Sequence, residues 1–422
     1  MTKSGPSKDL SLLRLGLGTL SLVVVLTMAG GWALPVVFFS ILLIIALHEL
    51  GHFATAKWTG MRVNSFFVGF GPTLWSWQRG ETTYGVKALP LGGFVKIVGM
   101  TSVEEVSDVD EARSFRSATF PRRVLVASAG SLVHLILAVA LAVSSLMIFG
   151  AADTSHVAIA GFNSWDGMAR NAAQQAGLEI GDVVVQLDGK VISTPTQLAT
   201  VIHARAGRNI FIVIERHGRR IALHAMPVDG RAIRTGGTWL EAPTNPTAVG
   251  YLGIGLEYPT IHDGLFSGVN HGVREVGSLA TSSVASLWHR LSPSGLGNLF
   301  DQVTNAKLAV SPAQQNSRPE SVVGIVRLAV QGAQSGSENL LYILMALNVF
   351  VGVINMLPLL PLDGGHVAIA CYERLRSRRG SRYRADIAKM TPVIYAFMGV
   401  LAFLFACSLY LDLAHPIANP FH

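Results

Sequence analysis

Long apolar runs separated by polar stretches organise this chain. A helix needs about 20 apolar residues to cross the hydrocarbon core of a bilayer, which is about 30 Å thick. The runs that are expected to form transmembrane helices cover residues 32–56, 123–150, 340–366 and 391–413. Residues 1–31 hold a shorter apolar run behind Lys3, Lys8 and Arg14, which is either an extra membrane helix or a signal-like segment. The pattern predicts a polytopic α-helical membrane protein.

The polar stretches between the runs differ from one another. Residues 57–122 include VGFGPTLWSW and YGVKALPLGGFVKIVGM, whose strand formers and glycines predict one or two membrane-associated β-hairpins on the cytoplasmic side. Gly92 and Gly93 allow turns or close backbone approach there, and they mark a candidate substrate-binding hairpin. Residues 229–339 show strand-like and amphipathic helical stretches and are expected to be an extracytoplasmic linker.

The stretch at 155–228 has a different organisation. Its core, QQAGLEIGDVVVQLDGKVI, is followed by a helical pattern and a hairpin. This order, and the A-G-L-x-x-G-D-x-V signature from Ala176 to Val184, resemble bacterial PDZ domains. Such domains bind peptides by adding a strand to a sheet edge. Another small β-rich domain is the alternative.

Composition and charge narrow the class. Of the 422 residues, 50% are hydrophobic and 14% are charged, and the formal net charge is +7. No basic stripe interleaved with aromatic residues appears in the sequence, so nucleic acid is not an expected partner. The basic residues flank apolar runs, and the positive-inside rule then places the N-terminus, 57–122 and 374–389 in the cytoplasm. Only Cys371 and Cys407 are present, which excludes a disulfide framework and a thiolate zinc site.

The first candidate chemistry lies at the end of the second apolar run, in HELGH. His48 and His52 are one helical turn apart and share a face, while Glu49 points about 100° away. This H-E-x-x-H arrangement is typical of zinc hydrolases, in which the imidazoles bind Zn²⁺ and the carboxylate acts as general base. Ionisable groups inside a membrane span are costly and usually functional.

A zinc site with two histidines needs a further protein ligand. Asp363 is the only acid in the apolar stretch 340–371, where two prolines break the helix and a Gly-Gly pair follows the carboxylate. His366 is a rival ligand for the same position. His134 lies inside the span 123–150, and its role is left open because a single buried histidine can also hydrogen-bond a neighbouring helix.

Together these motifs resemble the site-2 proteases, which are zinc intramembrane metalloproteases, and within them the bacterial RseP-like group with a single PDZ domain. The features that carry the resemblance are HELGH, VGFGP, PLGGFVK, the PDZ signature and NMLPLLPLDGG at 355–365. The resemblance implies that Asp363 is the third zinc ligand and that Asn355 positions the substrate or polarises its carbonyl. Two features depart from it: residues 130–134 read GSLVH where G-P-x-x-N is usual, and the N-terminal apolar run is extra.

The resemblance also implies a function. It predicts a zinc-dependent endopeptidase of the inner membrane, with its active site near the cytoplasmic side, that cleaves a single-pass membrane protein in regulated intramembrane proteolysis. The substrate would be an anti-sigma factor or a similar regulator, first shortened by an upstream site-1 type protease. The alternatives are a zinc transporter and a catalytically inactive PDZ membrane scaffold, and both would depend far less on Glu49.

Overall fold

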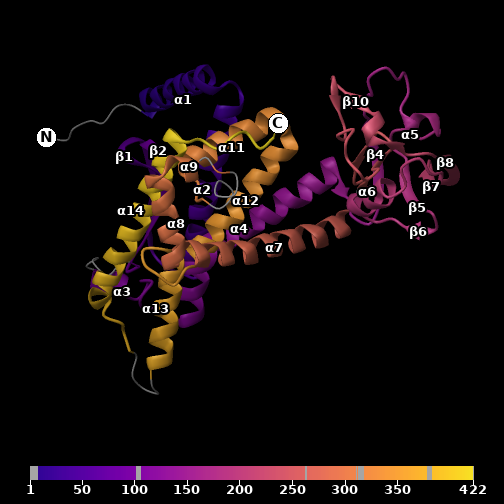
Figure 1. The fold of residues 1–422 in the computed structure, drawn as a ribbon. Coiled ribbons are helices and arrows are strands. Elements are labelled where there is room, and N and C mark those ends of the chain that lie inside the picture. The colour runs from indigo at the N-terminus through magenta and orange to yellow at the C-terminus, as the bar shows by residue number, and fades with distance from the viewer. Residues whose placement is uncertain are drawn as a thin grey trace. The chain divides into compact units, whose positions relative to one another are not determined.

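Two units make up the fold, and the second is inserted into the sequence of the first (Figure 1). The computed structural model describes residues 8–100, 106–261, 264–309, 311, 318–377 and 383–421. The larger unit combines Met1–Ser145 with Leu265–His422, and the smaller unit is Leu146–Gly264. Residues from distant parts of the chain therefore meet within the larger unit.

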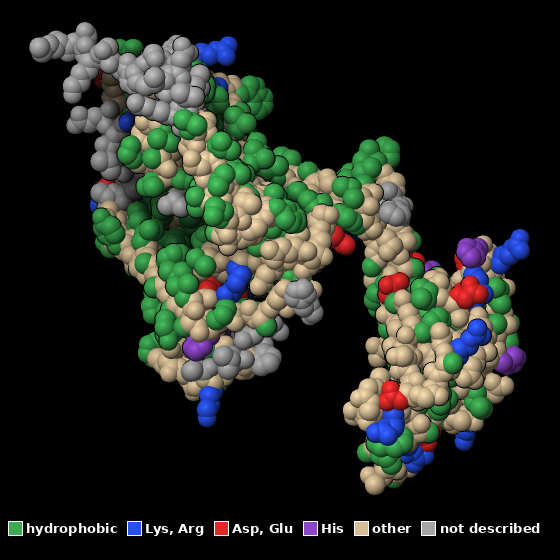
Figure 2. Space-filling view, turned by 90° about the horizontal axis from the view of Figure 1, so that it is seen from above, with side chains coloured by type: hydrophobic (Ala, Val, Ile, Leu, Met, Phe, Trp, Pro, Cys, Tyr) green, Lys and Arg blue, Asp and Glu red, His purple; other side chains and the backbone are tan. Residues whose placement is uncertain are grey.

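Helices dominate the larger unit. Four of its described helices are long and apolar enough to cross a membrane: α2 (Ala33–Trp58), α4 (Phe120–Phe149), α12 (Ser337–Asn355) and α14 (Thr391–Ala414). The remaining helices are α1 (Lys8–Gly30), α3 (Asp108–Glu111), α7 (Leu265–Leu291), α8 (Pro293–Thr304), α9 (Ala306–Ala309), α11 (Val322–Ser335), α13 (Asp363–Arg376) and the 3₁₀ helix η2 (Ile387–Met390). On the face drawn in Figure 2, hydrophobic side chains cover much of this unit's surface, as a lipid-facing protein requires.

The single helix expected over 340–366 is two helices. α12 ends at Asn355 and α13 begins at Asp363, because the prolines at 358 and 361 cannot continue a helical hydrogen-bond ladder. The start of α13 packs directly on the connecting segment: a Cβ added at Gly364 would lie 2.2 Å from the carbonyl oxygen of Met356. This break sets Asp363 at the first position of a new helix.

Small residues bring α2 and α12 close to α4. A Cβ at Gly51 of α2 would lie 2.8 Å from Val133 Cγ2, and one at Gly352 of α12 would lie 3.2 Å from His134 Cβ. Close backbone approach through glycine is a common way to pack membrane helices, since lipid gives little hydrophobic drive for their association. His48 of α2 and His134 of α4 consequently face one another.

The hairpin region forms one hairpin, β1 (Val63–Arg79) and β2 (Thr82–Ile97), whose long strands bend. Positive φ angles at Gly69 and Gly71 allow the bend in β1. The paired segments lie in the order 93–97, 63–68, 83–86 and 75–79. The segment that begins at Gly93 is therefore at one edge of this small sheet.

The smaller unit is a β-rich domain whose main sheet has the order β13-β4-β5-β7-β8, with β6 paired to β5. Ile210, Ile212 and Ile214 of β7 alternate into its core, as the period of a strand requires. Its strands and helices are β3 (Ala151–Ala152), β4 (Val157–Phe162), α5 (Ala172–Gln175), β5 (Val183–Leu187), β6 (Lys190–Val191), α6 (Pro195–His203), β7 (Ile210–Arg216), β8 (Arg219–Ala225), β9 (Val228–Asp229), η1 (Gly230–Ala232), β10 (Arg234–Thr235), β11 (Thr238–Trp239), β12 (Gly250–Tyr251), β13 (Ile254–Glu257) and β14 (Thr260–Ile261).

The expected domain boundary at residue 228 cuts through this unit. β13, from the stretch expected to be a linker, pairs with β4 and forms the edge of the main sheet. β3 and β14 pair with each other where the chain enters and leaves the unit. The smaller unit is thus one continuous stretch of sequence, inserted between α4 and α7.

Candidate metal centre

Three side chains from two helices converge in the larger unit. His48 Nε2 and His52 Nε2 are 3.2 Å apart on α2, and Asp363 Oδ2 on α13 lies 3.6 Å and 3.3 Å from them. His52 is buried and the other two are largely shielded. Their ligand atoms all lie within 4.8 Å of one another, a spacing that allows all three to bind one metal ion.

The hydrogen bonds around His52 explain why this cluster fits a cation. His52 Nδ1 donates to the carbonyl oxygen of Val126 at 2.8 Å, which leaves Nε2 with a bare lone pair. Asp363 Oδ2 is buried without a well-formed hydrogen bond among the described residues. Lone pairs that face each other at these distances repel unless a positive charge lies between them. Imidazole nitrogen and carboxylate oxygen are ligands that Zn²⁺ accepts.

Contacts at both ends of α13 hold Asp363 in place. At its start, the glycines after Asp363 pack against the turn that follows α12. In its last turn, Glu373 accepts a hydrogen bond from Arg123 of α4 at 2.5 Å and another from the backbone N–H of Ala385 at 2.8 Å. The largely buried Arg123–Glu373 pair joins α13 to the helix that carries Val126.

Glu49 lies beside this cluster and against the hairpin edge. A Cβ added at Gly93 would lie 2.9 Å from Glu49 Cγ and 3.1 Å from the carbonyl oxygen of Phe67. The backbone of Val95 also interacts with the Glu49 carboxylate. The structure therefore brings Glu49 and Gly93 together, while Gly92 packs on the ring of Phe70 instead.

The other residues singled out in the sequence have different surroundings. Asn355 is the last residue of α12 and is partly buried, one connecting segment away from Asp363. His366 packs edge-on against Phe115 and is not a member of the three-residue metal cluster. His134 is buried against His48, with 5.0 Å between the ring centroids.

Sequence reasoning missed two contributors to the site. A Cβ at Gly130 would lie 2.3 Å from His48 Cε1 and 2.5 Å from His52 Nε2, so only glycine leaves room for both rings. Asn348 of α12 accepts a hydrogen bond from His134 Nδ1 at 2.9 Å. The sequence could have pointed to Asn348, because it is a polar amide in the middle of an apolar helix. Such a residue usually has a function or a hydrogen-bond partner.

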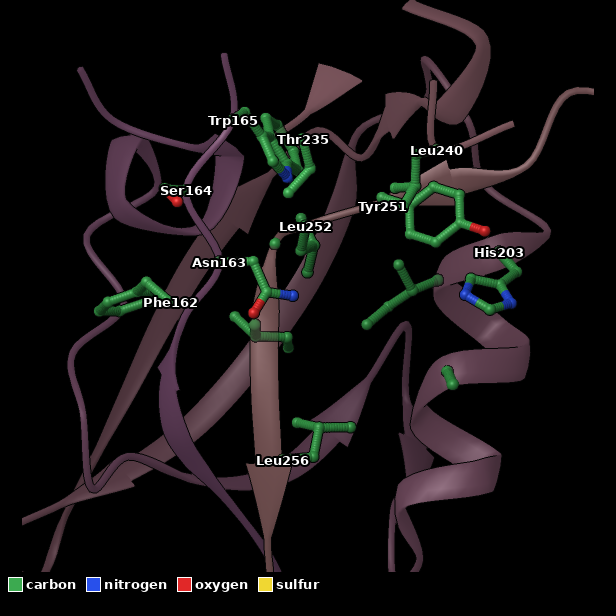
Figure 3. Close-up of a pocket in the computed structure, with 14 residues that line it drawn as sticks. Phe162, Asn163, Ser164, Trp165, His203, Thr235, Leu240, Tyr251, Leu252 and Leu256 are labelled. Atoms are coloured by element: carbon green, nitrogen blue, oxygen red, sulfur yellow. The ribbon is translucent and has the colours of Figure 1, made fainter. Parts of the chain in front are cut away.

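A second candidate site lies entirely within the smaller unit. Its cavity of about 460 Å³ is bordered by α6 and by the edge strand β13. Figure 3 shows Phe162, Leu252 and Leu256 on one side and His203 and Tyr251 on the other. The walls are mainly apolar, with a few polar groups such as Asn163, a composition typical of a site for a small ligand or a peptide.

Comparison with known proteins gives a family for this arrangement. The sequence profile of Peptidase family M50 matches residues 36–399. The protein named Zinc metalloprotease Rip1 from Mycobacterium tuberculosis (strain ATCC 25618 / H37Rv) is 32% identical over 407 residues, covering 90% of this chain and 96% of the relative. The protein of the same name from Mycolicibacterium smegmatis is 29% identical over 405 residues, covering 90% and 96%. Because the profile spans most of the sequence and all three residues of the metal cluster, the chain belongs to peptidase family M50.

Proposed function

We propose that this chain is a zinc-dependent intramembrane endopeptidase that cleaves a single-pass membrane protein inside or at the edge of the bilayer. The observation that carries the proposal is the meeting of His48, His52 and Asp363 among helices long enough to span a membrane. These three residues would hold the zinc ion. When bound, zinc supplies a Lewis acid that polarises a carbonyl and lowers the pKa of a coordinated water.

The chain's own residues would move the protons. Glu49 adjoins the metal ligands on the same helix, and it is placed to take a proton from the attacking water as general base. It would then give the proton to the departing amine nitrogen. His52 keeps its coordinating nitrogen free because its other nitrogen donates to Val126. Asn355, at the end of α12, is assigned to positioning the substrate backbone.

A helical substrate resists cleavage because its peptide groups are hydrogen-bonded internally. The hairpin edge that begins at Gly93 lies against Glu49 and offers a strand to which an unwound substrate segment could pair. We assign substrate binding to this edge and to the glycines at its start, Gly92 and Gly93. Capture as an added strand would hold an extended segment beside the general base.

The smaller unit would act as a PDZ domain that inspects substrates outside the membrane. The edge strand β13 and helix α6 border its cavity, an arrangement that suits binding of a peptide as an extra strand. By this proposal it admits substrates already shortened by an upstream site-1 type protease, such as anti-sigma factors. The protease would lie in the cell membrane with its metal centre near the cytoplasmic side, where basic residues flank the apolar helices.

The decisive experiment is Glu49→Gln in the full chain, with a single-pass membrane protein as reporter substrate. The amide keeps the size of the side chain but cannot act as a base, so cleavage should fall by about 10²- to 10⁴-fold. Zinc content, measured on the purified protein, should remain that of the wild type. The substrate that accumulates with the variant can then be identified by mass spectrometry. Retained cleavage by the variant would contradict the assignment of Glu49 as general base, whereas a wild-type chain that cleaves no reporter would favour transport or scaffolding.

The inspecting role has its own test. Residues 153–259 can be replaced by a short Gly/Ser linker, which leaves the paired β3 and β14 strands in place. The truncated enzyme should cleave full-length substrates that the wild type excludes. A truncated enzyme that keeps its zinc but cleaves neither full-length nor shortened substrate would refute the inspecting role.

A further inference from the structure

His134 is a buried side chain beside the metal cluster for which the proposed mechanism has no use. It lies on α4 with an exposed fraction of 2%. Its ring is tilted by 44° against the ring of His48, and the centroids are 5.0 Å apart. A polar ring at this depth among membrane helices is costly unless it is hydrogen-bonded and has a use.

A hydrogen-bond chain fixes the orientation of the His134 ring. Asn348 Nδ2 donates to the carbonyl oxygen of Leu344 at 2.8 Å, so the atom of Asn348 that faces His134 is the acceptor Oδ1. His134 Nδ1 lies 2.9 Å from this oxygen and must be the donor. Both side chains are buried, and Gly352 allows their helices to approach closely.

The two metal-holding imidazoles are supported differently. His52 is locked by its hydrogen bond to Val126. His48 Nδ1 is buried and, among the described residues, makes only a poorly formed hydrogen bond to the Gly130 backbone. Metal-ligating histidines usually have their second nitrogen fixed by a hydrogen bond that orients the ring. For His48, the ring of His134 lies against the imidazole and adds a second contact to that of the Gly130 backbone.

We infer that His134, locked by Asn348, is a positioning residue that holds the His48 imidazole in its metal-binding orientation. Asn348 of α12 fixes the ring of His134 on α4, and this ring contacts His48 on α2. Three membrane helices therefore contribute to the orientation of one ligand. This inference rests on the metal centre of the proposed function, but it concerns metal affinity and geometry rather than proteolysis.

The test measures metal binding by the full chain in detergent micelles. His134→Ala removes the ring, and Asn348→Ala keeps the ring but removes its hydrogen-bond acceptor. Each should raise the zinc dissociation constant about 10- to 100-fold in competition with a chelator. Both should also change the visible absorption bands of the Co²⁺-loaded protein, because the ligand geometry changes. Ser128→Ala on the same helix is the matched control, since its hydroxyl donates only within α4.

The outcomes separate a positioning role from a merely structural one. A weaker dissociation constant together with an altered Co²⁺ spectrum supports the inference. A folded His134→Ala protein with wild-type affinity and spectrum overturns it. It is also overturned if affinity falls with an unchanged spectrum while the metal-free protein melts correspondingly earlier. If His134→Ala does not fold, Asn348→Ala decides by the same criteria. A wild-type chain that binds no metal at this site would instead refute the proposed function.

Discussion

The space around the two imidazoles explains why residue 130 is a glycine. His48 and His52 occupy the positions where its side chain would lie, at 2.3 Å and 2.5 Å from an added Cβ. Distances of this size are far inside van der Waals contact, so a methyl group would displace both rings or the backbone of α4. At the residue scale, the metal centre therefore depends on the missing side chain at residue 130 as well as on the three ligands.

Gly130→Ala should therefore lose metal. We expect the zinc dissociation constant to rise by at least about tenfold, since even disturbance of a ligand's support has such an effect, and cleavage to fall with it. Isothermal titration of the metal-free protein measures the affinity. Gly399→Ala in α14, where an added Cβ meets nothing within 4 Å, is the matched control. Wild-type affinity in the Gly130 variant would show that the rings have more room than the structure gives them.

At the scale of single elements, the sequence predicted features that depend on local spacing better than features that depend on contacts between distant segments. The placement of His48, His52 and Glu49 follows from the period of one helix, and the sequence alone was sufficient for it. The approach of Asp363 depends on packing between α4 and α13, for which the sequence offered an isolated acid, a Gly-Gly pair and the family resemblance of NMLPLLPLDGG. The roles of these residues in catalysis remain predictions.

The errors at this scale arose where pairing partners are distant in sequence. The strand β13 was assigned to a linker because the PDZ-like signature ends earlier, and its partner β4 lies almost a whole domain away. The bends in β1 and β2 depend on contacts between their halves, which strand propensity does not encode.

The hairpin edge gives a prediction that separates cleavage from metal binding. In Gly93→Ala, the new methyl group would press on Glu49 Cγ and on the Phe67 carbonyl, without contacting the metal ligands. Cleavage should fall at least about tenfold, because small displacements of a catalytic group are costly. Zinc content should stay at the wild-type level. Gly399→Ala again serves as control, and loss of zinc in Gly93→Ala would contradict this separation.

The turn of the hairpin gives a pH prediction. Glu81 accepts hydrogen bonds from Arg113 at 2.7 Å and 2.9 Å and from Lys57 at 2.6 Å, and these contacts lower its pKa from 4.5 to about 2. A lowered folded-state pKa means that the stabilisation is full above pH 4.5 and is lost as the pH falls from 4.5 towards 2. The protection of the β1–β2 turn against hydrogen exchange, expressed relative to the intrinsic rate at each pH, should therefore fall below pH 4.5.

Glu81→Gln provides the control for this prediction. The amide cannot carry the charge, so the variant's turn should exchange faster than wild type at pH 6 and should lack the wild-type change in protection between pH 4.5 and 3. Because the carboxylate is partly exposed, solvent screening keeps the effect modest. Equal exchange of variant and wild type at pH 6 would mean that the three-residue contact contributes nothing to the hairpin.

At the scale of the whole molecule, the metal centre joins two distant parts of the sequence. His48 and His52 come from the part before the inserted unit and Asp363 comes from the part after it. Metal binding should therefore stabilise the assembled larger unit, by about 2.7 kcal/mol at a free zinc concentration 100 times the dissociation constant. Chelation should lower the melting temperature of the detergent-solubilised protein. Asp363→Ala should melt at the chelated temperature with or without zinc, and a zinc-dependent shift in that variant would contradict the assignment.

A buried ion pair makes a second connection within the larger unit, at the end of the last membrane helix. Arg318 Nη2 lies 2.9 Å from Asp412 Oδ1, and neither side chain has exposed surface. Asp412 Oδ2 also accepts from the backbone N–H of Ser321 at 2.7 Å, so the carboxylate ties the start of α11 to the end of α14. Asp412→Ala removes the hydrogen-bonded partner of the buried Arg318 guanidinium, with which Glu320 also interacts, and should destabilise the protein by about 3 to 5 kcal/mol.

The double variant Arg318→Met with Asp412→Leu removes both charges and fills much of the same volume. Replacing a buried pair by apolar side chains is often neutral or even stabilising, because the cost of desolvating two charges disappears. The double variant should therefore be more stable than Asp412→Ala, although Ser321 loses its acceptor in both. Unfolding in increasing SDS measures the difference. If the double variant is as unstable as the single one, the tie depends on the hydrogen bond to Ser321 and not on the paired charges.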